Sequence, residues 1–522
     1  MDRDGPDDGN INKISSVLKK LQIFDIAKGL FYRLSLWSKK EGNRFRWRIH
    51  ARFPNLVSSP TANPSDRPSR DKADNQSTRV STGENLTLGC IWVAELYGPS
   101  EIEALYSGLR KFGWDKAEVG LSGFDPISWI KNQRMYGYGG HFNVGYVYRP
   151  GTTSWHPQRY FSPVPDKFSH LIVRIYQITK SVTCVSVGFV LNNKHAKCYE
   201  SEINQDRQGF NKRQSGQRGY SVFDVIHIKK EKLQKTREKY RDQATKWFET
   251  CLPGLFSRDS DGRRFPTSEL IFTNGQITFP RIEEHQSCPK WIRFLDLDFA
   301  RELWSSDQYP GLKFSLNQLE GDLRFHIIAT VKRDDAKQIK RGTADTSTDS
   351  GLIFCLGEAF NEVLVHYACI ALLSEIRRDL VEYRESISLS RGGRAKLLKV
   401  LFKLEKFFAE SIGVRAAAQE LLAASRDTFH FVELQGSGFT YKDNYGAIAK
   451  THDIADSFRS QTAFLAEEVI ADESATRELF EQLSTIMSTR ENVIAQAKME
   501  KLTWITIAFA FISVVMAYLA LK

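Results

Sequence analysis

The sequence lacks the cysteine patterns that mark disulfide-bonded and zinc-binding proteins. Its seven cysteines are an odd number, lie far apart along the chain and include no Cys-x-x-Cys pair. Secreted disulfide scaffolds and structural zinc sites both need cysteines at close or regular spacings. We therefore expect free, reduced thiols, which are typical of a protein that faces the cytoplasm.

The sequence also lacks the motifs of the common enzyme classes. It contains no Gly-x-Ser-x-Gly nucleophile elbow, no Gly-x4-Gly-Lys-Ser/Thr phosphate loop and no His-Glu-x-x-His zinc motif. Asp296 and Asp298 could hold a divalent cation, but such a pair usually ends a strand at the surface. His141, His156 and His170 have no ligand-like spacing. The sequence therefore predicts no enzyme, and it supports no cofactor or metal site.

The N-terminus lacks the basic start and apolar core of a secretory signal, whereas the other end of the chain is strongly apolar. Residues 502–521 carry no charge, and at about 1.5 Å per residue a helix of this length spans about 30 Å, the thickness of a hydrocarbon core. Trp504 and Tyr518 lie near its two ends as interfacial anchors, and Lys498 and Lys501 flank its start. We predict a transmembrane helix; a buried core helix is the alternative.

The positive charge of the chain is concentrated near its start. Residues 13–52 hold eleven Lys and Arg against two acidic residues, and so carry +9 of the total charge of +11. The first part of this stretch places its apolar residues on one helical face, which predicts a basic amphipathic segment over 1–53. Such a segment binds anionic lipid, although docking on the protein's own core is an equal alternative. The lipid-surface candidates are Lys13, Lys19, Lys20, Lys28, Arg33, Lys39 and Lys40.

The rest of the chain divides by composition. Residues 54–85 are rich in Ser, Pro, Asn and Thr, which predicts a disordered linker. Residues 86–331 predict an α+β domain, with strands at 86–96, 141–148, 170–179, 181–191 and 220–228. A polar hinge over 332–351 leads to a helical stalk domain over 352–501, with helices at 352–386, at 394–425 and from about 447, and a loop at 435–446. Glu362 and His366 indicate that the first of these helices is buried in protein and is no second span.

The last helix carries a 3.5-residue repeat that runs toward the membrane segment. Positions at alternating spacings of four and three extend from Phe458 to Ala497, interrupted by Asp472 and Arg490. Such a repeat is typical of a coiled-coil stalk that packs on copies of itself or on its neighbours; an amphipathic helix in a monomeric helical layer is the alternative. Inside the span, small residues share one face and let membrane helices approach closely. This packing face is Thr503, Thr506, Ala510, Ser513, Ala517 and Ala520.

The C-terminal part resembles the CorA-type magnesium transporters. That family combines a soluble α/β domain, two long antiparallel helices and a stalk helix that continues into the membrane. The junction at 488–512 is similar to the family's stalk-to-membrane segment in Asn492 and in the pair Leu502-Thr503. The chain departs from the family beyond this first span, because it lacks the Gly-Met-Asn motif and the second span. The resemblance therefore implies the layout and the membrane attachment, and it transfers no ion-binding residue.

These features lead to two functional hypotheses. The first is a C-terminally anchored, single-pass and oligomeric membrane protein, whose CorA-like stalk forms or perturbs an ion pathway under control of its cytoplasmic domain. The alternative is a tail-anchored binding, scaffold or sensor protein, for example a membrane-acting defence effector, without transport activity. Both place the bulk of the chain in the cytoplasm, with membrane lipid and copies of the chain as expected partners. The basic stretch 207–246 also holds acidic residues, so a nucleic-acid partner is not expected. The sequence does not identify a ligand for residues 86–331.

Overall fold

The computed structural model describes residues 66–520 apart from short gaps, and before them only residues 42, 44–46 and 49. The gaps are 117–124, 138, 153–158, 214–219, 258–263, 281–287, 299, 301, 317–323, 340–345, 390–400, 403, 406, 409–411 and 444–449. The chain divides into two compact units. The smaller comprises 1–82, 200–235 and 286–296, and the larger comprises 83–199, 236–285 and 297–522. The segment boundaries expected from composition stay predictions.

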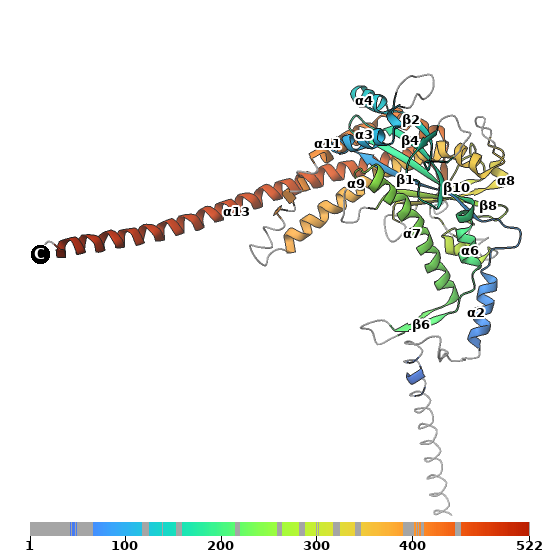
Figure 1. The fold of residues 1–522 in the computed structure, drawn as a ribbon, viewed down its shortest axis with the longest axis horizontal. Helices are drawn as coiled ribbons and strands as arrows, with labels where there is room; N and C mark the ends of the chain where they lie inside the picture. Colours follow the sequence, from blue (N-terminus) through green and yellow to red (C-terminus); the bar gives the residue numbers. More distant parts are fainter. Residues whose placement is uncertain are drawn as a thin grey trace, which may run out of the picture. The chain divides into compact units, whose positions relative to one another are not determined.

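The larger unit is built on one mixed sheet of eleven strands, several of which are drawn as arrows in Figure 1. Every residue of β1 (Thr87–Tyr97), β5 (Thr183–Leu191) and β8 (Thr267–Thr273) is buried. Long apolar runs of this kind form strands that are covered on both faces. The prediction of an α+β fold is confirmed to the extent that the chain contains a mixed sheet domain. The other strands are β2 (His141–Tyr148), β3 (Arg159–Phe161), β4 (Phe168–Gln177), β9 (Leu303–Ser305), β10 (Leu312–Leu316), β11 (His326–Lys332), β12 (Thr440–Asp443) and β13 (Lys450–Asp453).

The strand order of this sheet is β13-β12-β9-β10-β11-β8-β1-β5-β4-β2-β3. Neighbouring strands are antiparallel, except that β8 pairs parallel with β11 and β2 pairs parallel with β3. In the β2–β4 pair, His141 lies opposite Tyr176. Because directly opposed residues share one face of a sheet, these two side chains point to the same side.

One edge of the sheet is a hairpin, β12–β13, in a region for which the sequence analysis expected a loop at 435–446 and a helix from about 447. That expectation was wrong, because the helix begins only at Ile454. Thr440 of β12 pairs with Ser305 of β9, and the Phe439 ring stacks on Tyr309 with 5.6 Å between ring centroids. The hairpin is stabilised by partners far away in the sequence, which a local pattern does not reveal.

Helix α9 (Asp349–Leu389) is the core helix of the larger unit. It contacts β1 and β5, and the Ser186 hydroxyl donates a hydrogen bond to its Asn361 at 2.5 Å. By length and composition alone α9 could cross a membrane, but 78% of its most apolar window is buried inside the protein. The sequence-based assignment of this helix to the protein interior is therefore correct.

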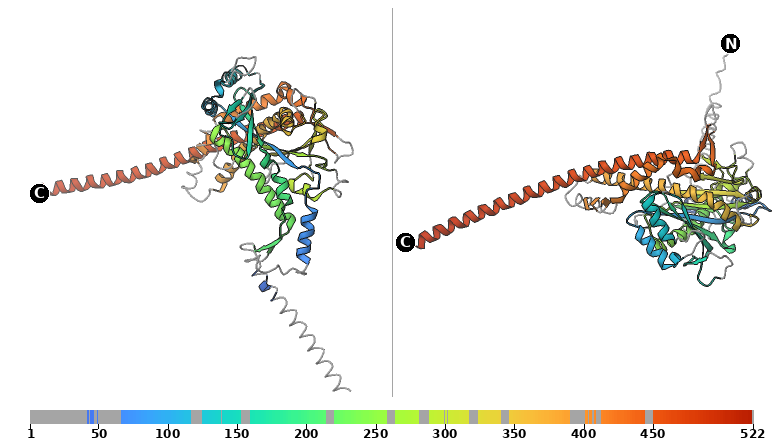
Figure 2. Two further views of the ribbon diagram at one scale, coloured as in Figure 1. Left: turned by 45° about the vertical axis from the view of Figure 1, so that its right-hand side comes forward. Right: turned by 90° about the horizontal axis from the view of Figure 1, so that it is seen from above.

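Helix α13 (Ile454–Ala520) is a single helix of 67 residues that runs out from the sheet, with α9 beside its first part (Figure 2). Ion pairs join Arg377 to Glu468 at 2.6 Å and Arg384 to Asp472 at 2.8 Å. The residue numbers of the paired side chains increase together along both helices, so α9 and α13 run in the same direction.

A shorter helix, α11 (Ile412–Arg426), packs on α13 in the opposite direction. Arg415 pairs with Glu473 at 3.2 Å and Arg426 pairs with Glu467 at 3.1 Å. As the residue number increases along α11, the number of its partner on α13 therefore decreases. A helix was expected over 394–425, and the structure describes a continuous helix there only from Ile412 onward. Two long antiparallel helices are not shown among the described residues.

Among the residues that the structure describes, the remaining helices are short, except for one that begins in the smaller unit and ends in the larger. That helix is α7 (Val225–Cys251), and it starts within the strand expected at 220–228. The others are α3 (Ile102–Lys111), α4 (Pro126–Tyr136), α5 (Asn193–Ala196), α6 (Cys198–Asn204), α8 (Arg333–Ala336), α12 (Val432–Gly436), and the 3-10 helices η1 (Trp114–Lys116), η4 (Lys290–Leu295) and η5 (Thr428–Phe431).

The smaller unit contains α2 (Asp66–Ser77), the two-stranded sheet of β6 (Phe210–Arg213) and β7 (Tyr220–Phe223), and the start of α7. Helix α2 lies within 54–85, so the expectation of a disordered linker was wrong for these residues. The Asn75 side chain donates to the Arg207 carbonyl at 2.7 Å and accepts from the Arg207 amide at 2.9 Å. Hydrogen bonds from a remote segment thus stabilise a helix that has almost no apolar residues.

Candidate functional site

The last part of α13 is long and apolar enough to cross a membrane, as predicted. None of its most apolar window is buried in the single chain. From Leu502 to Ala520 the helix extends about 28 Å, close to the thickness of a hydrocarbon core. Its large side chains are open to the surroundings, with Trp504 66% and Phe511 70% exposed. A water-soluble chain would leave this much contiguous apolar surface without a partner.

The six small residues of the predicted packing face are all helical and exposed. The hydroxyls of Thr503, Thr506 and Ser513 each donate a hydrogen bond of 2.9 Å to the carbonyl four residues earlier. In hydrocarbon, such a bond satisfies a hydroxyl without water and without a neighbouring helix. All three hydroxyls of this face are therefore compatible with close approach of a second backbone.

The 3.5-residue repeat of α13 has two different environments. Phe458, Leu465 and Val469 are buried in the larger unit, whereas Ile486 is 60% and Val493 is 58% exposed. The first half of the repeat therefore packs within the chain, as the alternative of a monomeric helical layer requires. The second half remains open for a partner.

The interfacial candidates Lys498, Lys501, Trp504 and Tyr518 are exposed on α13 and flank or end the apolar stretch. The lipid-surface candidates Lys13, Lys19, Lys20, Lys28, Arg33, Lys39 and Lys40 lie outside the described residues, so the basic amphipathic segment stays a prediction.

Asp296 of the smaller unit is engaged by side chains of α7. Its carboxylate accepts hydrogen bonds from Lys230 Nζ and Gln234 Nε2, both at 3.0 Å. The sequence analysis considered a divalent cation at Asp296, but in the structure the ammonium group of Lys230 neutralises this carboxylate. Among the described residues, the group of ligands that could hold a metal ion lies elsewhere, in the larger unit.

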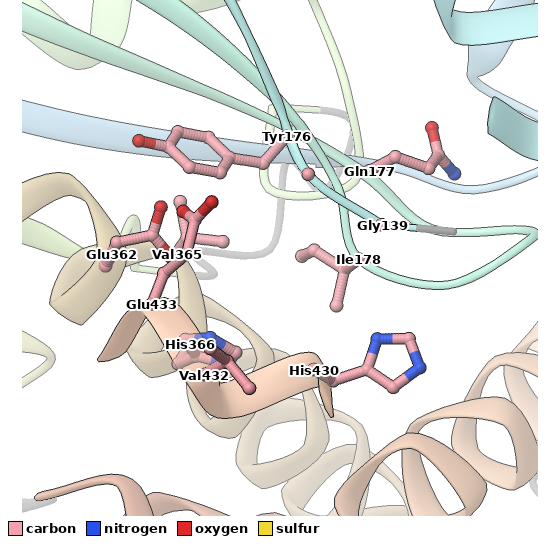
Figure 3. Close-up of a pocket in the computed structure, with 11 residues that line it drawn as sticks. Gly139, Tyr176, Gln177, Ile178, Glu362, Val365, His366, His430, Val432 and Glu433 are labelled. Atoms are coloured by element: carbon pink, nitrogen blue, oxygen red, sulfur yellow. The ribbon is translucent and has the colours of Figure 1, made fainter. Parts of the chain in front are cut away.

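A pocket of about 360 Å³ in the larger unit is lined by residues of the sheet and of α9, η5 and α12, including Glu362 and Glu433, and His141 lies beside these two glutamates. His141 comes from the start of β2, Glu362 from α9 and Glu433 from α12. One nitrogen or oxygen atom of each of these residues lies within 4.8 Å of the other two. Figure 3 shows the carboxyl groups of Glu362 and Glu433 next to each other near the ring of Tyr176.

The two carboxyl groups of the pocket differ in protonation. His141 Nδ1 lies 3.4 Å from Glu433 Oε2. The hydrogen bonds from His141 and from Glu362 lower the pKa of Glu433 to about 2. Burial, followed by the neighbouring Glu433, raises the pKa of Glu362 well above its usual value. At neutral pH the pair therefore holds one proton and one negative charge.

Aromatic rings form part of the pocket lining. Tyr176 is 4% exposed, and its buried hydroxyl interacts with Glu362 of the pocket and with Arg174. His366 stacks on Phe431 with 4.5 Å between ring centroids. Burial, followed by the charge of His430, lowers the pKa of His366 to about 4, so its ring is neutral at pH 7.

The sequence analysis did not predict this cluster. It found no ligand-like spacing for His141, and it interpreted Glu362 and His366 only as signs that their helix is buried. The available signal was the spacing of those two ionisable residues, one helical turn apart in a long apolar helix. His141 and Glu433 are contributed by remote segments, so no spacing within one segment could show the complete group.

No protein-family model matches the chain, and neither a curated protein nor a solved structure matches it. The likeness to CorA-type transporters thus rests on the sequence alone. The function has to be argued from the geometry of α13 and of the pocket.

Proposed function

We propose that this protein is a C-terminally anchored, single-pass membrane protein that oligomerises through its span and forms or perturbs an ion pathway under control of its cytoplasmic domain. The observation that carries the proposal is the continuity of α13. One helix, Ile454–Ala520, begins in the core of the larger unit and ends as an exposed apolar stretch of membrane-spanning length.

The anchor follows from burial. Large apolar side chains from Leu502 to Leu519 are exposed on the single chain, and hydrocarbon is the environment that would remove them from water. Helical backbone satisfies its own hydrogen bonds, and the hydroxyls of Thr503, Thr506 and Ser513 do so as well. Lys498 and Lys501 remain at the polar boundary.

Control by the body of the protein follows from the way in which α13 is held. Ion pairs join its Glu468 and Asp472 to α9, and its Glu473 to α11. Between the last buried residue, Met487, and Leu502 the helix continues for about 22 Å without a break. A rotation of α13 against α9 would therefore also turn the packing face of the span.

Oligomerisation is supported by two exposed surfaces of α13. The small-residue face of the span allows close packing, which is the main source of helix association in lipid. The exposed half of the 3.5-residue repeat, with Ile486 and Val493, presents further apolar side chains on the part of α13 that precedes the span. Several copies around one axis would bury both surfaces, as in the CorA-like layout that the sequence resembles.

The test replaces Ala510 and Ser513 together by Leu. The added side chains separate neighbouring backbones at the packing face, while they make the anchor more apolar. We expect the oligomer to dissociate, measured by crosslinking in the membrane and by mass in mild detergent, and ion flux from proteoliposomes to fall to background.

The matched control replaces Ala508 and Val515, on the other side of the same helix, by Leu. This variant should keep both the oligomer and the flux. A wild-type protein that is monomeric in both assays would contradict the oligomer. A wild-type oligomer without flux would contradict the ion pathway and favour the tail-anchored scaffold or sensor.

A further inference from the structure

We propose that His141, Glu362 and Glu433 form a binding site for a divalent transition-metal ion of the zinc type, with at least one coordination position left open to the pocket. This site is independent of the membrane span, and its test does not depend on the proposed ion pathway.

The first argument is the geometry of the three side chains. Their candidate ligand atoms lie within 4.8 Å of one another, and the pair His141 Nδ1 and Glu433 Oε2 is 3.4 Å apart. A tetrahedral zinc ion with bonds of about 2.1 Å separates its ligand atoms by about 3.4 Å. One pair thus already has the required separation, and the other ligand needs a movement of about 1 Å, within reach of a Glu rotamer change.

The second argument concerns a residue that surrounds the ligands. The Tyr176 side chain lines the same pocket and is 4% exposed, and its hydroxyl interacts with the Glu362 carboxyl group. A partner of this kind outside the ligand set orients a metal-binding carboxylate, so Tyr176 would hold Glu362 toward a bound ion.

The third argument is the chemistry of the ligand set. Two carboxyl groups lie side by side, and a metal ion between them would take the place of the proton that they share. The imidazole nitrogen suits zinc, copper, iron and nickel, whereas magnesium, calcium and manganese prefer oxygen ligands. Three protein ligands leave a fourth position for water, as in open zinc sites.

Metal binding would also connect three elements that are far apart in the sequence. His141 belongs to β2, Glu362 to α9 and Glu433 to α12, a short helix that packs on α13. Glu433 is 55% exposed at its side chain, so an ion can reach it from solvent. A bound ion would thus fix α12 against the sheet.

The experiment uses the full-length protein in detergent, with reduced thiols and after treatment with chelator. Cobalt is the probe, because its visible absorption distinguishes nitrogen and oxygen ligands from thiolates. We expect one equivalent to bind with visible bands and no thiolate charge-transfer band. Zinc should displace it and raise Tm, whereas magnesium in excess should do neither.

The variant His141→Gln with Glu433→Gln should lower cobalt affinity at least about 100-fold. The control His170→Gln makes the same chemical change on the neighbouring strand β4, outside the pocket, and should leave affinity unchanged. The metal-free Tm and the circular dichroism of all three proteins establish that they are folded. Glu433→Gln alone, at a half-exposed side chain, provides a second and milder variant.

Three results would overturn the proposal. The first is equal cobalt binding by wild type and by the folded double variant. The second is a thiolate band in the spectrum, which would place the ion at cysteines. The third is no binding at all, which would leave His141, Glu362 and Glu433 as a proton-sharing group without a metal.

Discussion

Replacing Glu269 by Gln tests the buried charge network at the centre of the sheet. Glu269 lies on β8 and is fully buried, as is its partner Arg237. Arg237 Nε donates to both carboxylate oxygens, at 2.9 and 3.0 Å, and the Tyr199 hydroxyl donates at 2.6 Å. Gln keeps the shape of Glu but removes the charge, so Arg237 becomes an uncompensated cation in the protein interior.

The magnitude follows from that burial. Breaking a buried ion pair by removing one partner costs about 3–5 kcal/mol. In a unit of more than 200 residues, each kcal/mol corresponds to about 2 °C or more, so we expect Tm to fall by about 6–10 °C. Thermal unfolding followed by tryptophan fluorescence measures this, because Trp92 and Trp304 are buried in the same unit. The control Glu231→Gln removes an exposed partner of Lys235 on α7 and should change stability by less than about 1 kcal/mol.

The pH dependence of the same variant provides the sharper criterion. Burial alone would raise the pKa of Glu269, but the charge of Arg237 and the His326 hydrogen bond outweigh it and hold this pKa well below its usual range. A carboxyl group with a lowered pKa in the folded state stabilises the fold above its unfolded pKa of about 4.3, and this contribution is lost as the pH falls. The difference between wild type and variant should therefore be largest near pH 7 and shrink below about pH 4.5.

Two results would refute this reasoning. The first is a variant that unfolds within 2 °C of the wild type at pH 7, on the order of 1 kcal/mol. That would mean that Arg237 finds another partner or reaches water. The second is a difference that stays constant on acidification, which would assign the loss to packing rather than to charge.

Two further predictions concern Glu95 and the topology. Burial raises the pKa of Glu95 to about 7, against the opposing hydrogen bond from Ser257, so its stabilising contribution should be complete below about pH 4.5 and decline toward pH 7. Glu95→Gln should remove that slope from Tm measured between pH 5 and pH 8. For the topology, protease added outside intact cells should leave residues 1–501 whole, because Lys498 and Lys501 favour a cytoplasmic start of the span. Digestion of the sheet domain would show the opposite orientation.

Much of the sheet was predictable because its signal is local. The apolar runs at 86–96 and 181–191 became β1 and β5, which are buried along their full length. A strand covered on both faces needs apolar residues at every position, and such a run is visible in one segment. The hairpin β12–β13 and the polar helix α2 have no comparable signal, because Ser305, Tyr309 and Arg207 stabilise them from elsewhere in the chain.

The apolar helix from Leu502 onward is what the sequence by itself determined most firmly. Hydropathy and length decide whether a helix can span a bilayer, and both are properties of one uninterrupted segment. Only the tertiary structure decided which half of the α13 repeat is buried and that the side chains of His141, Glu362 and Glu433 lie together. The physical reason is the same in both cases: a contact between segments depends on where the folded backbone places them, and neither segment alone carries that information.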